Sequence, residues 1–192
     1  MSWYVLQCRA GKEAEIVHSL NQHLDRKALE EAFYFQSERL WRVDGSWKRQ
    51  IKELFPGYVF LQSEHPGLLS KALEEYRQIV RIMEEPGYLI SVYPEEEACL
   101  RGLCGQDHLL SLSYGYKDRV TGCSRITRGP LAGRENQVKT FDWHRRFAKM
   151  EISIGNRKAS VWAGLALDEA GSVVGNLKNS REHSTAYEAC WI

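Results

Sequence analysis

The spacing of hydrophobic residues changes from one period to another along the first hundred positions. The opening run WYVLQCR is typical of a β-strand, and apolar residues from Ile16 to Leu24 then recur at helical spacing. Further on, two strand-like runs flank the dipeptide Asp44-Gly45, which favours a two-residue turn. This spacing predicts a strand, a helix and a long antiparallel hairpin.

Two more helices are expected before residue 105. Pro94 is followed by three glutamates, and proline suits the first helical position because its missing N–H would have no partner there. The acidic side chains suit the positive end of the helix dipole. The other helix is marked by apolar residues on one face, namely Leu69, Ala72, Leu73 and Tyr76. This part of the chain is therefore predicted to be an α+β domain.

The helical and the alternating patterns both fade after the helix that starts at Pro94, and the pattern that follows is that of β-structure. Apolar residues alternate with polar ones from Ala148 to Ile154, and Gly155-Asn156 then supplies a turn before the alternation resumes. This predicts a hairpin in a small barrel-like domain. The expected organisation is an α+β domain at 1–105, a linker at 106–116, a β domain at 117–170 and a polar tail at 171–192.

Charge is distributed unevenly, although 26 lysines and arginines nearly balance 25 aspartates and glutamates. Residues 117–160 carry 11 basic and 4 acidic side chains, a net charge of +7. Residues 1–116 carry 13 basic and 17 acidic side chains, and residues 161–192 carry 2 and 4. The concentration of positive charge in one segment favours an anionic partner such as RNA for the β domain.

Neither a leader peptide nor a membrane span is expected. The N-terminus has no basic stretch leading into an apolar run, and no segment reaches the roughly 18 uninterrupted apolar residues that a membrane helix needs. The 43% hydrophobic content is ordinary for a globular protein, and the five cysteines follow no disulfide framework. We therefore expect a cytoplasmic protein with reduced thiols and no membrane partner.

A zinc site and an enzyme active site are two alternatives with little support in the sequence. The candidate zinc ligands lack a paired C-x2-C element; they are Cys99, Cys104, His108 and Cys123. The histidines fall in no catalytic signature, and no glycine-rich loop is arranged to hold phosphates. We expect no metal, no cofactor and no catalytic residue, and a thiol- or zinc-dependent enzyme is the alternative from another class.

Three segments resemble, in the same order, the NusG family of transcription elongation factors: WYVLQCRAGKE, LFPGYVFL and RVTGCSRITRGPLAGRE. The resemblance covers residues 3 to about 168 and implies an N-terminal α/β sandwich-like domain, called NGN, and a small C-terminal β-barrel, called KOW. The segment DWHRRFAK resembles the specialised branch typified by the antiterminator LoaP. Asn136 stands where the family commonly has glycine, and because asparagine tolerates a left-handed backbone the turn is retained.

The resemblance implies that the N-terminal domain binds RNA polymerase through exposed apolar residues. The matching positions are Trp3, Phe55 and Tyr58, with Tyr4 as a neighbour. Aromatic side chains suit such an interface because they bury a large area at a small entropic cost. The alternative from the residues alone is that these aromatics pack inside the domain, as most aromatics in strands do.

The resemblance also implies that loops of the KOW domain face nucleic acid or a protein. Arginine and lysine would contact phosphates, while Trp143 and His144 would stack on unpaired bases. The candidate RNA-binding residues are Arg125, Arg128, Arg134, Lys139, Trp143, His144, Arg145 and Arg146. The alternative is that Trp143 plugs the small barrel and the arginines are simply solvated.

These resemblances imply a specialised antitermination factor that binds RNA polymerase through the NGN domain and a hairpin in the nascent leader RNA through the KOW domain. The alternative is a general NusG-like elongation factor whose KOW domain contacts a ribosomal protein or a termination factor.

Overall fold

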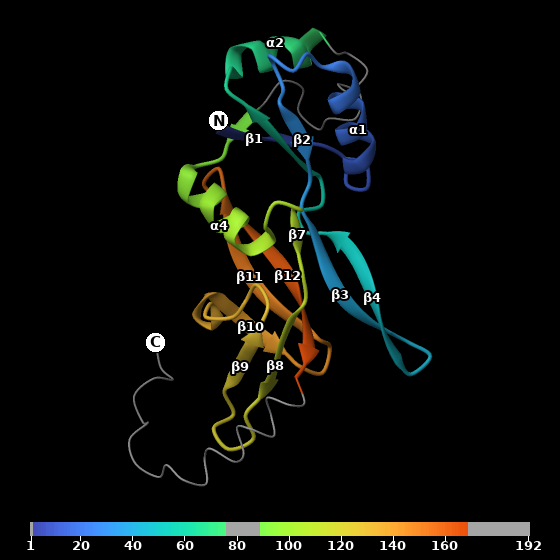
Figure 1. Ribbon diagram of the computed structural model, residues 1–192, viewed down its shortest axis with the longest axis vertical. Coiled ribbons are helices and arrows are strands. Elements are labelled where there is room, and N and C mark those ends of the chain that lie inside the picture. The colour runs from blue at the N-terminus through green and yellow to red at the C-terminus, as the bar shows by residue number, and fades with distance from the viewer. Residues whose placement is uncertain (1, 76–88, 169–192) are drawn as a thin grey trace. The chain divides into compact units, whose positions relative to one another are not determined.

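A β-hairpin built from residues 31–63 contributes strands to two sheets. In the computed structural model, which describes residues 2–75 and 89–168, its turn is Asp44-Gly45, with φ angles of 49° and 78°. Positive φ at both residues is what a two-residue turn between twisted strands requires. Its strands are β2 (Glu31–Phe33), β3 (Gln36–Val43), β4 (Ser46–Glu53) and β5 (Tyr58–Ser63). Because β2 pairs with β5 and β3 with β4, the predicted hairpin is confirmed (Figure 1).

The described residues divide into two compact units. Unit 1 comprises residues 2–36, 52–75, 89–110 and 152–161, and unit 2 comprises residues 37–51, 111–151 and 162–168. The hairpin of residues 31–63 therefore supplies strands to both units. The expected polar tail at 171–192 and the helical position Tyr76 lie outside the described residues.

Unit 1 is built on a four-stranded sheet in the order β2-β5-β1-β6. The predicted first strand is β1 (Ser2–Gln7), and it runs antiparallel to both β5 and β6 (Leu89–Ser91). Ser2 lies opposite Ser63 in β5. Residues opposite each other in the two strands point to the same face of the sheet, and successive residues point to alternate faces.

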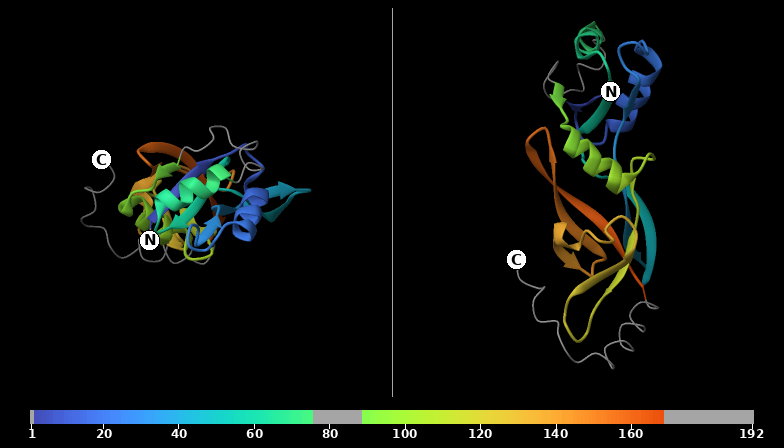
Figure 2. Two further views of the ribbon diagram at one scale, coloured as in Figure 1. Left: turned by 90° about the horizontal axis from the view of Figure 1, so that it is seen from above. Right: turned by 60° about the vertical axis from the view of Figure 1, so that its left-hand side comes forward.

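Two helices cover one face of this sheet. The helices α1 (Glu13–His23) and α2 (Pro66–Glu75) lie side by side and confirm two predictions made from apolar spacing (Figure 2). Their apolar stripes hold them against the strands, because burying one leucine or isoleucine side chain contributes roughly 1.5–3 kcal/mol. The core between helices and sheet includes Leu6, Ile16, Leu20, Val59, Leu61, Leu69 and Leu73.

The third described helix, α4 (Pro94–Cys104), begins at the proline predicted to start it. The carboxylate of Glu96 accepts a hydrogen bond from the backbone N–H of Tyr93, the N-cap residue, at 3.0 Å. This contact supplies a partner for one of the N–H groups that a helix start leaves unsatisfied. The helix ends at Gly105.

Unit 2 contains most of a five-stranded sheet in the order β10-β11-β12-β8-β9. Ala148 and Met150 are buried in alternation, as predicted, and the turn Gly155-Asn156 has φ angles of 55° and 65°. That turn belongs to unit 1. The strands are β8 (Ser113–Lys117), β9 (Ser124–Arg128), β10 (Val138–Asp142), β11 (Phe147–Ile154) and β12 (Arg157–Leu167).

The stretch 106–116, expected to be a linker, contains the two-residue strand β7 (Leu109–Leu110) and most of β8. Ser113 and Gly115 are buried in β8 although neither is hydrophobic, so the alternation that marks a strand is missing from the sequence. The hydroxyl of Ser113 accepts a hydrogen bond from the Leu131 N–H at 3.1 Å, which compensates its burial. With three α-helices and twelve strands in its described residues, the chain has the predicted α+β fold.

Candidate functional site

The face of the unit 1 sheet that α1 and α2 leave uncovered carries a group of aromatic side chains. Alternation along β5 explains it, because Val59 and Leu61 join the core under the helices and Phe60 points to the other face. The ring centroids of Phe35 and Phe60 are 4.7 Å apart, and such pairs each contribute about 0.5–1.5 kcal/mol beyond burial. We call this group the aromatic cluster, and its members are Trp3, Phe33, Phe35, Phe55 and Phe60.

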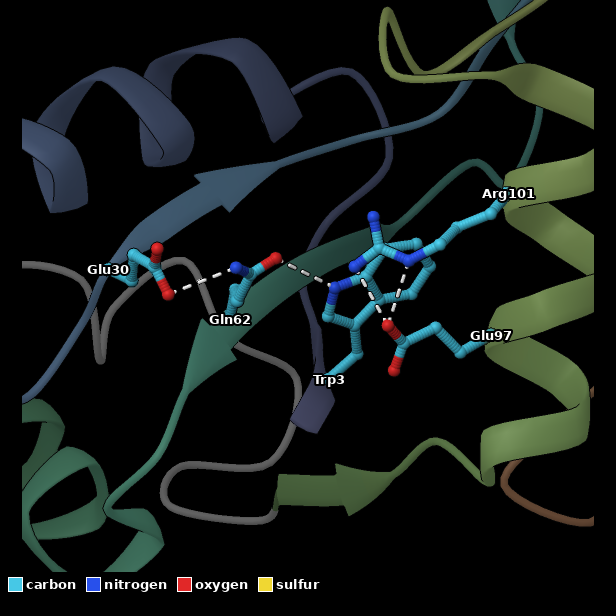
Figure 3. A network of polar contacts seen from close by, with 5 residues as sticks. All are labelled: Trp3, Glu30, Gln62, Glu97 and Arg101. Atoms are coloured by element: carbon cyan, nitrogen blue, oxygen red, sulfur yellow. Dashed lines mark hydrogen bonds and ion pairs between the residues drawn. The ribbon is translucent and has the colours of Figure 1, made fainter. Parts of the chain in front are cut away.

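Trp3 is fully enclosed in the aromatic cluster, with 1% of its surface exposed. Its indole N–H donates a hydrogen bond to Oε1 of Gln62 at 3.0 Å, and Nε2 of Gln62 donates to Glu30 at 3.0 Å (Figure 3). From α4, the guanidinium carbon of Arg101 lies 4.3 Å from the centre of the indole ring. Glu97 holds that guanidinium at 2.7 Å, so both the edge and the face of Trp3 have polar partners.

The four aromatic residues predicted to form an interface differ in position. Trp3 and Phe55 are buried, at 1% and 4% exposure, and Tyr58 is half-buried. The Tyr58 ring lies 6.4 Å from that of Phe55, and its hydroxyl accepts a hydrogen bond from Nε2 of Gln7 at 3.2 Å. Tyr4 packs against the core on the opposite face of the sheet. The structure therefore brings three of the four together and separates Tyr4 from them.

A tight turn in the segment LFPGYVFL holds Phe55 and Tyr58 in place. The Tyr58 N–H donates to the Phe55 carbonyl at 3.1 Å, and Gly57 between them has a φ of +82°. The Gly57 N–H donates to the buried carboxylate of Glu13 at 2.5 Å, while its carbonyl accepts from the Cys8 N–H at 2.8 Å. The turn is therefore fixed on both sides of its glycine.

His108 is a member of this region that the sequence did not reveal. Its ring stacks on Phe33 with centroids 3.8 Å apart, and its backbone has a φ of +53°. Its Nδ1 atom is buried and has no hydrogen-bond partner within the described part of the chain. Burial lowers the pKa of His108, which favours the neutral ring. A stacking contact between residues so far apart in sequence leaves no local signal.

Two of the cysteines considered for the zinc and thiol alternatives lie on one helix. Cys99 and Cys104 both lie on α4, as expected. Burial, with a smaller contribution from Cys99, raises the pKa of Cys104 to about 12, so this thiol is protonated at neutral pH and a poor nucleophile. Within residues 2–75 and 89–168, no group of histidine, cysteine, aspartate and glutamate is arranged to hold a metal ion.

In unit 2, the eight candidate RNA-binding residues divide by exposure. The exposed ones are Arg125, Arg128, Lys139, His144 and Arg145. The half-buried ones are Arg134, Trp143 and Arg146. Lys139 lies 3.7 Å from Glu151, and Arg145 lies 3.9 Å from Asp142. Such exposed pairs contribute only about 0–1 kcal/mol, so a phosphate can replace either acid.

The turn between β10 and β11 contains the aromatic and basic residues singled out in the sequence. The Trp143 N–H donates to the Ser124 hydroxyl at 2.9 Å, and its ring is parallel to that of Phe141 at 6.1 Å. Arg146 has a φ of +61°, and its guanidinium carbon lies 5.3 Å from the ring centre of Trp47. Its Nη1 atom is buried without a hydrogen-bond partner among the described residues, and burial lowers the pKa of Arg146.

A family model described as transcription termination factor NusG matches residues 1–100, which is more than half of the chain. This chain belongs to the NusG family. The matched residues include all four strands of the unit 1 sheet and the Gly57 turn. The resemblance inferred from three short segments is thereby confirmed at the level of the family.

Curated relatives share the name "Transcription termination/antitermination protein NusG". The one from Vibrio vulnificus is 24% identical over 170 residues, covering 83% of this chain and 90% of the relative. The one from Yersinia pestis is 24% identical over 182 residues, covering 88% and 96%. A solved structure titled "Domain interaction in Thermotoga maritima NusG" is 17% identical and covers 85% of this chain and 93% of its own, with a TM-score of 0.44.

Membership of the family decides between the two classes of protein considered from sequence, a transcription factor and an enzyme. NusG proteins are transcription factors, so this NusG-family chain is a termination or antitermination factor and not an enzyme. No helix within the described residues is both long and apolar enough to cross a membrane.

Proposed function

We propose that this NusG-family protein is a specialised antitermination factor that binds RNA polymerase through unit 1 and nascent leader RNA through unit 2. One observation carries the RNA part of the proposal. Within the segment of net charge +7, five candidate RNA-binding residues are exposed, and the turn that joins β10 to β11 contains Trp143, followed directly by His144, Arg145 and Arg146. Exposed cations beside an aromatic ring suit phosphates and unpaired bases.

The polymerase part of the proposal rests on the aromatic cluster. Trp3 and Phe55 are buried and would support an interface from beneath, while half-buried Tyr58 would make direct contact at the rim. Rigid support is favourable because little side-chain entropy is then lost on binding. On this proposal Tyr4, which packs under the helices, contributes less than Tyr58.

A general NusG-like factor with a protein partner is the second candidate, and one observation favours it. Trp162 on β12 is 36% exposed and packs edge-on against Phe147 at 4.6 Å. An exposed tryptophan held by a half-buried phenylalanine on a β-sheet suits a protein interface, such as one with a ribosomal protein or a termination factor.

Single-round transcription separates the two candidates. Two templates share one intrinsic terminator, and only one of them encodes a leader hairpin. The specialised factor should increase read-through on the hairpin template alone, and the combined change Lys139→Gln, Arg145→Gln and Arg146→Gln should abolish that increase, because phosphate contacts are lost.

A matched control removes charge elsewhere in the same basic segment. Arg157 and Lys158 are exposed at the start of β12, outside unit 2, so the change of both to Gln should leave read-through intact. Equal read-through on both templates by the unaltered protein would instead support the general factor.

A further inference from the structure

The hairpin formed by β3 and β4 has two faces of different character. The two-residue turn Asp44-Gly45 places Val43 opposite Ser46, and residues directly opposite each other share a face. By this register Arg42 lies opposite Trp47, and the 6.0 Å between the Arg42 guanidinium and the Trp47 ring agrees with it.

One face, which we call the inner face, is turned toward the rest of unit 2. The Arg49 guanidinium donates a hydrogen bond to the Tyr114 hydroxyl at 3.1 Å and pairs with Glu38 at 3.7 Å. The Glu38 carboxylate also accepts from the Leu112 N–H at 3.0 Å. The acid and the cations of this face therefore already have partners inside the unit.

The opposite face of the same hairpin, which we call the outer face, has a different composition. Trp41 is 64% exposed there, more than any other tryptophan in the described residues. Lys48 lies directly opposite Trp41 by the register of the turn, and it is exposed. Arg39 precedes Trp41 on the same face, with its Nε donating to the Ser37 hydroxyl at 3.0 Å. Residues 39–50 place no acidic side chain on this face.

An exposed tryptophan ring with cations on the same face is suited to a single-stranded nucleic acid. Base stacking on an aromatic side chain needs an accessible ring face, and neighbouring cations hold the phosphates on either side of the base. A paired duplex cannot offer its bases to Trp41 without opening. Residues 39–50 supply cations and no acid to the outer face, which suits a polyanion better than a protein surface of mixed charge.

We propose that the outer face of the β3–β4 hairpin, with Arg39, Trp41 and Lys48, binds unpaired RNA by stacking a base on Trp41. The choice of RNA over DNA rests on the proposed function, since the hairpin lies in unit 2 and Trp47 on its inner face contacts Arg146, a candidate RNA-binding residue. This site binds single-stranded nucleotides. It is separate from the site at the β10–β11 turn that is proposed to bind the leader hairpin.

The test uses the full chain and fluorescence anisotropy of labelled oligouridine. Trp41→Ala should weaken binding about 5- to 150-fold, the loss expected for one stacked base. Ile51→Ala is the matched control, because Ile51 is 53% exposed on the inner face of the same hairpin. The affinity of this variant for oligouridine should equal that of the unaltered chain. Circular dichroism of each variant verifies the fold.

Three further probes separate the outcomes. Oligothymidine should bind more weakly than oligouridine, and tighter binding of DNA would overturn the assignment to RNA. Equal oligouridine affinity in Trp41→Ala and Ile51→Ala would overturn the site itself, as would a Trp41→Ala defect confined to polymerase binding. The triple Gln variant at Lys139, Arg145 and Arg146 should lose the leader hairpin while keeping Trp41-dependent oligouridine binding, so failure of one proposal is distinguishable from failure of the other.

Discussion

Gly57 offers a direct test of how the turn in LFPGYVFL holds Phe55 and Tyr58. A Cβ at this position would lie 2.8 Å from the Cys8 carbonyl oxygen, and the backbone φ is +82°. The positive φ costs a residue with a side chain about 1–2 kcal/mol, and forced overpacking adds about 1–3 kcal/mol. Gly57→Ala should therefore lower the free energy of unfolding by about 2–5 kcal/mol.

Gly11 is the matched control for this prediction. Its φ is +86°, but a Cβ there would meet no atom within 4 Å, so Gly11→Ala should cost only the conformational part, about 1–2 kcal/mol. Urea unfolding of both variants, followed by circular dichroism, measures the difference between them. Equal losses at the two positions would refute the steric argument and show that β1 and β5 relax around the new methyl group.

Two further predictions concern the aromatic face of unit 1. Tyr58→Ala should weaken binding to purified RNA polymerase by about 1–3 kcal/mol, and Tyr4→Ala, on the helix side of the sheet, should have a smaller effect; equal effects in a pull-down of folded variants would contradict this. Because burial lowers the pKa of His108 below its ordinary 6.5, the unfolded chain binds this proton more readily, so stability should fall as the pH drops below 6.5 until the folded pKa is passed. His108→Asn should flatten that pH dependence of the urea midpoint, and an unchanged dependence would assign it to other groups.

Local pattern was sufficient for those parts of the fold in which one residue type meets one local requirement. Asp44-Gly45 and Pro94 each indicated the turn or helix start that the structure contains. The sequence did not reveal β8, because Ser113 and Gly115 are buried without being hydrophobic. One neighbour of β8 is β12, which is distant in sequence and places Leu165 opposite Ser113, and no local period records that pairing.

The candidate interface residues show the same limit. An aromatic residue in a strand has two faces to choose from, and alternation alone places Trp3 and Tyr4 on opposite ones without saying which is covered. The structure assigns Tyr4 to the helix side and encloses Trp3 between Gln62 and Arg101. Both contacts join residues far apart in sequence, so the enclosure of Trp3 required the three-dimensional arrangement.

The basic residues of unit 2 also differ in what they can offer an RNA, although they look alike in sequence. Lys139 and Arg145 are exposed and pair with Glu151 and Asp142, and because such surface pairs are weak a phosphate can displace either acid at little cost. Arg146 has lost part of its hydration already, and it faces the ring of Trp47 with one buried N–H group that has no hydrogen-bond partner in residues 2–75 and 89–168. A phosphate or base oxygen that reached that N–H would give it an acceptor, and buried donors gain more from a partner than exposed ones do. Exposed cations would therefore set the salt dependence of RNA binding, whereas Arg146 would contribute a part that salt screens less.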